Sequence, residues 1–216
     1  MTIDTLDGLL EEQLKDLYHA EKQLTKALPK MAKAASDPEL KSAFTEHLKQ
    51  TKGQVARIEQ VFELLEKKAK AKPCAAMKGL VEEGQETIQQ DASDEMKDCM
   101  LIASAQRAEH YEIAAYGTVR TIAEALGNQE VVDLLHQTLE EEKETDAKLS
   151  QISRRILAEA GGETEEEDES DEDEVDESDE EDEGDEEEEE DDDEDKKSFS
   201  PAPAKKKAPA PAKRKR

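Results

Sequence analysis

Apolar residues recur every three or four positions through four long stretches of the chain, the spacing of one helix face. This pattern predicts long helices over residues 5–33, 37–67, 93–127 and 129–160. No stretch alternates apolar and polar residues as a half-buried strand would. The connection over residues 68–92 predicts a short amphipathic helix of its own, marked by Met77, Leu80, Val81 and Ile88.

Capping residues mark several of the predicted helix ends. Asp37 is a suitable N-cap with Pro38 in the first turn behind it, and Ser93 can cap the third long helix. Gly127 and Gly161 follow the third and fourth helices, where glycine commonly ends a helix. These signals support the boundaries that the apolar pattern gives.

The lengths of the connections predict how the helices are arranged. Short links make the first and second helices antiparallel, and likewise the third and fourth. The link over residues 68–92 is long enough to travel the length of the bundle, so the second and third helices run parallel. We therefore expect an all-α fold: a ferritin-like four-helix bundle with one long crossover that carries a short extra helix.

Polar residues interrupt the apolar stripe of every long helix. An unpaired carboxylate in an apolar core is very costly, so acids on an inward face call for a compensating positive charge. The interrupting residues that could bind a metal ion are Glu21, His47, Glu109, Glu112, Glu142 and Asp146.

Counting along the helices places these residues at one level. Glu21 and His47 each lie about 13 residues from the first turn, a depth of about 20 Å at the rise of an α-helix. Glu109 and Glu142 lie about 16 residues from the turn between the third and fourth helices, a depth of about 25 Å from the opposite end. The two depths add up to the length of a 30-residue helix, roughly 45 Å. The counting therefore predicts that these four residues lie in one cross-section of the bundle.

Carboxylates with a single imidazole are ligands that suit iron or manganese. The sequence thus predicts a centre for two iron or manganese ions, with Gln50, Gln54 and Tyr116 as polar neighbours of the ligands. Other readings stay open: the acidic face could be wet and pair with Arg107 or Lys143, and His47 could be a hydrogen-bonded core residue. Asp146 could contact the ligands rather than the metal.

Charge divides the chain into three parts. Residues 1–162 carry a net charge of −9, residues 163–195 hold 28 acids and no base, and residues 196–216 hold nine bases and no acid. The last two parts contain few large apolar residues, so we expect them to be disordered. The basic part alternates with Ala-Pro spacers and could bind nucleic acid weakly through Lys205, Lys206, Lys207, Lys213, Arg214, Lys215 and Arg216.

The chain contains no long apolar run and no signal-like start, so we expect a cytoplasmic protein without a membrane contact. Two cysteines without a CxxC motif indicate neither a disulfide framework nor a zinc site.

Several segments resemble the YciE/YciF family of bacterial ferritin-like proteins. They are LYHAEKQLTKALPKMAKA, HLKQTKGQVARIEQV, PCAAMKGLVEE, AQRAEHYEIAAYGT and LEEEKETDAKL, in this order over roughly residues 3–156. The resemblance implies a ferritin-like bundle, a dinuclear metal centre and a link to general or osmotic stress. Gln50 stands where the resemblance implies a glutamate, and residues 163–216 are not part of the family pattern.

Two functional hypotheses follow. The first is a di-metal stress-response protein that oxidises Fe(II) or consumes peroxide, and the sequence does not identify a catalytic residue. The second is a non-enzymatic scaffold, associated with the nucleoid or with a protein partner, that acts through its charged tail. In either case we expect a homodimer.

Overall fold

The computed structural model describes residues 3–161, which form five α-helices and no strand. The predicted acidic segment 163–195 and basic segment 196–216 lie outside the described residues. The helices are α1 (Leu6–Ala34), α2 (Pro38–Leu64), α3 (Ala75–Gln89), α4 (Asp94–Ala125) and α5 (Gln129–Glu159). The predicted all-α fold class is confirmed.

Three of the predicted boundary signals act as expected. The Asp37 side chain accepts a hydrogen bond from the backbone N–H of Leu40, and Ser93 does the same for Met96. Gly127 follows α4 in the left-handed region at φ +70°, and the N–H of Asn128 reaches back to the carbonyl of Ala123. This pair of features is the glycine-ended helix stop that the sequence predicted.

The second helix ends earlier than its predicted limit at residue 67. Glu66 lies in the left-handed region at φ 55°, and the N–H of Lys67 bonds to the carbonyl of Phe62 at 2.8 Å. The chain therefore ends α2 with the same motif as α4 but without a glycine. A left-handed glutamate gives no signal in the sequence, so the predicted end was three residues late.

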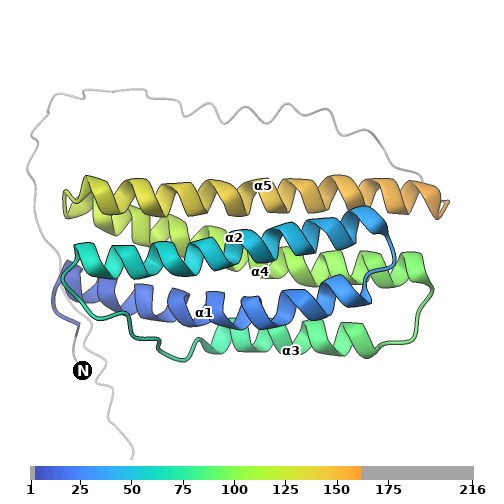
Figure 1. The fold of residues 1–216 in the computed structure, drawn as a ribbon, viewed down its shortest axis with the longest axis horizontal. Coiled ribbons are helices and arrows are strands. Elements are labelled where there is room, and N and C mark those ends of the chain that lie inside the picture. Colours follow the sequence, from blue (N-terminus) through green and yellow to red (C-terminus); the bar gives the residue numbers. More distant parts are fainter. Residues whose placement is uncertain (1–2, 162–216) are drawn as a thin grey trace, which may run out of the picture. The chain divides into compact units, whose positions relative to one another are not determined.

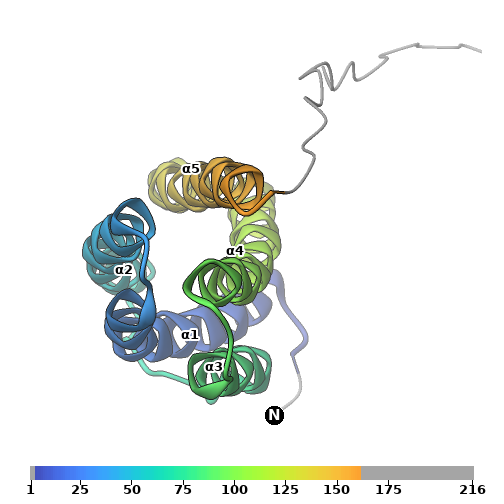
Figure 2. The ribbon, with the colours of Figure 1, turned by 90° about the vertical axis from the view of Figure 1, so that its right-hand side faces the viewer.

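The helices follow the predicted topology. In Figure 1, α1 and α5 run in one direction and α2 and α4 in the other, so α2 and α4 are parallel. The crossover between them carries α3 back along the bundle. Seen from the end in Figure 2, α1, α2, α5 and α4 surround the interior, and α3 packs on the outside against α1 and α4. This is the one-crossover arrangement of ferritin-like bundles.

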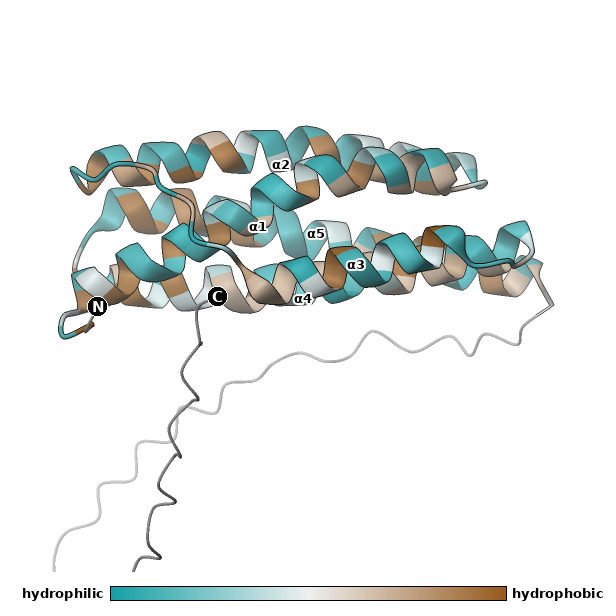
Figure 3. Ribbon diagram, turned by 90° about the horizontal axis from the view of Figure 1, so that it is seen from below, coloured by the Kyte–Doolittle hydropathy of each residue, from teal (hydrophilic) through white to brown (hydrophobic). Residues whose placement is uncertain are grey.

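The interior consists of two apolar clusters with polar residues between them. One cluster includes Leu28, Phe44 and Ile152, and the other includes Leu14, Phe62 and Leu135. On every long helix the stretch between the two clusters holds buried polar side chains, such as Glu21 on α1 and Glu142 on α5. Figure 3 shows hydrophobic and hydrophilic residues alternating at short intervals along the helices, as expected for amphipathic helices.

Within residues 3–161, no helix combines the length and the apolar character needed to cross a membrane.

Candidate metal centre

Five ionisable side chains meet in the polar layer between the two apolar clusters. Glu21 comes from α1, His47 from α2, Glu109 and Glu112 from α4, and Glu142 from α5, and each is at most 2% exposed. All five were predicted from the interrupted stripes. The structure brings residues from all four long helices to one cross-section, the arrangement that the counting predicted.

Four of these residues point their ligand atoms at a common point. Nε2 of His47 lies 3.2 Å from Oε1 of Glu109 and 3.8 Å from Oε2 of Glu142. One ligand atom from each of His47, Glu109, Glu112 and Glu142 lies within 4.8 Å of the other three. Atoms bound to one cation at 2.0 to 2.2 Å would be separated by at most about 4.4 Å, so the cluster needs only a slight contraction to hold a metal ion.

Most of the polar atoms at this point have no hydrogen-bond partner among residues 3–161. Both carboxylate oxygens of Glu112 and of Glu142, one oxygen of Glu109 and Nε2 of His47 are buried without a hydrogen bond. Buried polar groups in folded proteins nearly always have a partner, and an unpaired buried charge is costly. A cluster of such atoms, all of them good metal ligands, fits a bound cation.

Glu21 lies beside this cluster, and Tyr116 fixes its position. The hydroxyl of Tyr116, which is fully buried on α4, donates a hydrogen bond to Oε1 of Glu21. The other oxygen of Glu21 is buried and has no partner. The tyrosine was predicted as a polar neighbour of the ligands, and it holds one oxygen of Glu21 while the second remains able to bind a cation.

Burial dominates the electrostatics of the acids. It raises the pKa of Glu21 to about 8, although the hydrogen bond from Tyr116 and the nearby His47 oppose this shift. Burial also raises the pKa of Glu112 and of Glu142 well above the usual range, and the neighbouring carboxylates add to both shifts. Without a cation the interior therefore favours protonated carboxyl groups.

His47 responds in the opposite way to the same neighbours. Its burial would lower the pKa of the imidazole, but the negative charge of Glu109 and the contact with it outweigh burial and raise the pKa. A cation at this point would replace the protons as the positive charge that the carboxylates need.

Thr145 determines which nitrogen of His47 faces the cluster. Its hydroxyl donates to the backbone carbonyl of Glu141 at 2.9 Å, and Oγ1 lies 3.4 Å from Nδ1 of His47. Because the hydroxyl proton is used by the carbonyl, Oγ1 can accept the proton of Nδ1–H. With a cation bound, this would leave the lone pair of Nε2 of the neutral imidazole available as a ligand, as in metal-binding histidines.

An arginine beside the centre fastens α2 to α5. Arg57 binds both oxygens of Glu141, at 2.8 and 3.0 Å, and the hydroxyl of Thr138 at 2.5 Å. Gln54 donates to the same carboxylate at 3.1 Å, while its own side-chain oxygen is buried without a partner. Gln54 was predicted as a polar neighbour of the ligands, and it bridges this ion pair and the polar layer.

Asp146, a predicted ligand, is not brought into the cluster. Its carboxylate accepts hydrogen bonds from Gln106 at 3.0 Å and pairs with the exposed His110 at 3.3 Å. The stripe on α5 continues inward through Thr145, one residue earlier. Steps of three and of four both keep a residue on one helix face, so the sequence pattern alone did not separate the two positions.

Gln50, the last predicted polar neighbour, is half-buried and lines a cavity next to His47. Sequence reasoning missed Thr145, Arg57 and Glu141. The helix period did not distinguish Thr145 from Asp146. The Arg57–Glu141 pair joins two helices that are distant in the sequence and carried no signal.

The chain is similar to known proteins in sequence as well as in fold. The family model described as "Domain of unknown function (DUF892)" matches residues 5–161. The chain belongs to this family. It is 48% identical to the protein YciF of Escherichia coli (strain K12) over 154 residues, which is 71% of this chain and 93% of that protein.

Solved structures of similar proteins share the bundle. The crystal structure of the E. coli stress protein YciF matches with a TM-score of 0.70 and 47% identity, covering 72% of this chain and 98% of that one. The protein YcfI of Rhodopseudomonas palustris matches with a TM-score of 0.67 and 42% identity, covering 68% and 94%. A protein from Xanthomonas campestris pv. campestris, at 24% identity and a TM-score of 0.57, supports the fold alone; it covers 71% of this chain and 94% of its own.

Proposed function

We propose that this DUF892 protein is a stress-response protein whose bundle holds two iron or manganese ions and uses them to oxidise Fe(II) or to consume hydrogen peroxide. One observation carries the proposal: the buried and unpartnered ligand atoms of Glu109, Glu112, Glu142 and His47. The similarity to the E. coli stress protein YciF supports the assignment to stress.

The number of ions follows from the charges. Four buried glutamates can carry four negative charges, and two divalent cations would balance them. Glu21 lies to one side of the four-residue cluster and has a free oxygen for the second ion. A single chain supplies all five residues, so the proposed centre does not require the predicted homodimer.

The donor set fits iron or manganese better than softer metals, because it contains four carboxylates, one imidazole and no thiolate. Bound at such a centre, these metals supply one-electron redox chemistry. The chain's own residues would hold the ions, exclude water and release their protons as the cations bind. At pH 7 we expect proton release on loading, because the pKa values of Glu21, Glu112, Glu142 and His47 are all raised.

Metal analysis and turnover test this proposal. The full chain is purified without added metal, stripped, and loaded with Fe(II) or Mn(II). We expect about two ions per chain, uptake coupled to proton release, and oxidation of Fe(II) by O₂ or H₂O₂. A double substitution, Glu109→Gln with Glu142→Gln, should abolish binding and turnover.

The matched control is Glu124→Gln with Glu130→Gln, which removes the same two charges from exposed positions on the same helices. It should bind and turn over as the wild type does. If the wild type binds neither metal, the proposed function is wrong.

A second function rests on the nine bases and Ala-Pro spacers of residues 196–216. In this alternative the tail binds nucleic acid through phosphate contacts, and the bundle is a scaffold. A gel shift of the full chain, compared with a chain that ends at Gly162, tests it. Salt-sensitive binding that is lost with the tail would support this alternative.

A further inference from the structure

A polar cavity leads from the surface to the centre between α2 and α5. It has a volume of about 150 Å³, room for several water molecules. Its inner wall includes His47 and Glu109, which are each 2% exposed, and its lining continues outward through Gln50 and Thr145. Nε2 of His47 and one oxygen of Glu109 are buried without a hydrogen bond, so the cavity ends at groups able to bind a cation.

The mouth of this cavity is charged. Glu46, Glu144 and Lys148 lie at its outer end, with two carboxylates for one ammonium group. Nζ of Lys148 binds Oε2 of Glu46 at 2.8 Å and so links α5 to α2 across the opening. Both side chains are substantially exposed, at 43% and 60%, and exposed ion pairs of this kind contribute little to stability. The link can therefore open at low cost.

A second cavity also touches Glu109 but has a different character. It lies under α3, is lined almost entirely by apolar residues such as Leu28, Val81 and Ile88, and has a volume of about 20 Å³. A hydrated cation would lose most of its water there and gain few polar contacts. The lining of the polar cavity includes the side-chain oxygens of Glu46, Gln50, Glu109, Glu144 and Thr145.

We propose that divalent cations reach the centre through the polar cavity between α2 and α5, with Glu144 attracting them and the Glu46–Lys148 pair limiting their entry. This inference rests on the proposed function, because it assumes that the centre binds cations. It adds the route and the residues that control it. A negative mouth on a narrow entrance raises the local cation concentration and the rate of entry, an effect that salt weakens.

The test follows the rate at which the metal-free full chain takes up Co²⁺, measured by stopped-flow visible absorption. Glu144→Lys reverses a charge at the mouth and should slow uptake about tenfold at low salt, with little difference at 0.5 M salt. Lys148→Met should speed uptake severalfold, because it removes the ion pair and a repelling charge. The final amount of bound Co²⁺ should equal that of the wild type in both variants.

Two control variants make the result specific. Glu130→Lys makes the same charge change on the same helix, 14 residues from Glu144 and therefore about 21 Å away, and should leave the rate within about twofold. Gly84→Leu fills the apolar cavity, since a Cβ added at Gly84 meets nothing within 4 Å. It should leave the rate unchanged.

The outcomes separate this inference from the proposed function. A wild type that binds no Co²⁺ overturns both. Normal binding with equal slowing by Glu144→Lys and Glu130→Lys overturns the route alone, because only the total charge would matter. Slowing by Gly84→Leu but not by Glu144→Lys places the entrance under α3 and also overturns the route.

Discussion

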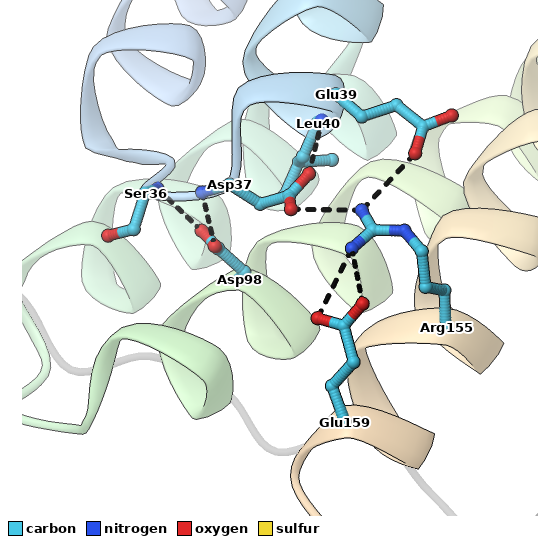
Figure 4. A network of polar contacts seen from close by, with 7 residues as sticks. All are labelled: Ser36, Asp37, Glu39, Leu40, Asp98, Arg155 and Glu159. Carbon is cyan, nitrogen blue, oxygen red and sulfur yellow. Dashed lines mark hydrogen bonds and ion pairs between the residues drawn. The ribbon is translucent and has the colours of Figure 1, made fainter.

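The part of the chain that the structure describes buries carboxylates in two regions, which differ in how far the protein supplies their partners. At one end of the bundle, Asp98 is 2% exposed and accepts the backbone N–H groups of Ser36 and Asp37 at 2.8 and 2.7 Å. In the same network Asp37 caps α2 and binds Arg155 at 2.9 Å (Figure 4). Midway along the bundle, no group within residues 3–161 donates a hydrogen bond to Glu112 or Glu142.

This difference distinguishes a structural network from a binding site. Arg155 also binds Glu39 at 3.2 Å and Glu159 at 3.2 Å, so every carboxylate of the network in Figure 4 has a cationic or N–H partner. The hydrogen bonds that Asp37 accepts and the charge of Arg155 lower the pKa of Asp37, although this side chain is partly buried. In the polar layer burial prevails and the pKa of Glu112 and Glu142 rises. Acids with internal partners stabilise the fold, whereas acids without them need a partner from outside.

The largest expected effect is that of metal on the polar layer. Loading with Mn²⁺ at a thousandfold excess over the dissociation constant should stabilise the bundle by about 4 kcal/mol for each ion bound. For a unit of this size that corresponds to a rise in Tm of roughly 10 °C. Differential scanning calorimetry of the stripped and the loaded full chain measures this shift.

The Glu109→Gln, Glu142→Gln variant provides the control. It should show no rise in Tm with Mn²⁺, and without metal it should be at least as stable as the stripped wild type. A stripped wild type that is clearly more stable than this variant would mean that the acids have partners within the protein.

Asp98→Ala, in the network at the end of the bundle, gives the next largest effect. It removes the acceptor of two partly buried backbone N–H groups, so we expect a loss of about 3 kcal/mol. Urea unfolding should give the same loss with and without Mn²⁺, because the network does not touch the polar layer. Asp98→Asn, which keeps one acceptor oxygen, should recover part of the loss. A loss that depends on metal would show that the two regions are coupled.

These two regions also differ in how far the sequence revealed them. The level of Glu21, His47, Glu109 and Glu142 could be predicted because the rise along a helix is constant and the two turns are at opposite ends. The sequence could not decide between Thr145 and Asp146 as the inward residue, since both positions are compatible with the helix period.

The network in Figure 4 was missed for a different reason. Asp98 lies on α4 but caps backbone groups between α1 and α2, and Arg155 comes from α5. Contacts between three or four elements leave no local pattern, although the Asp37 cap was visible because its partner is only three residues away. The left-handed Glu66 escaped prediction in the same way, as its conformation is set by hydrogen bonds rather than by residue type.

The response to pH is the third prediction. Folded Glu21, with a pKa of about 8, keeps a proton that the unfolded chain releases near 4.5, so the folded state binds more protons between these values. The free energy of unfolding of the metal-free protein should therefore fall as pH rises from 5 to 8, by an amount on the order of 3 kcal/mol. His47, whose pKa is also raised, acts in the same direction. Asp37 has a lowered pKa and contributes equally throughout this range.

Urea unfolding of the stripped protein at several pH values measures this slope, and Glu21→Gln should reduce it. Loading with metal should abolish the fall, since the cation replaces the protons. A stability that rises over the same range would contradict the assignment of unpartnered acids to the polar layer.

The smallest expected effect separates two tyrosines on α4. Tyr116 supplies the hydrogen bond to Glu21, so Tyr116→Phe should destabilise the metal-free protein by about 1 kcal/mol and raise the pKa of Glu21 further. The fall in stability with pH should then extend to higher pH.

Tyr111→Phe is the matched control, because Tyr111 donates to Asp16 at 2.5 Å on the half-exposed side of the helix. Tyr111→Phe should lower the free energy of unfolding by a similar amount without shifting its pH dependence. If both variants shift that dependence equally, Tyr116 does not act through Glu21.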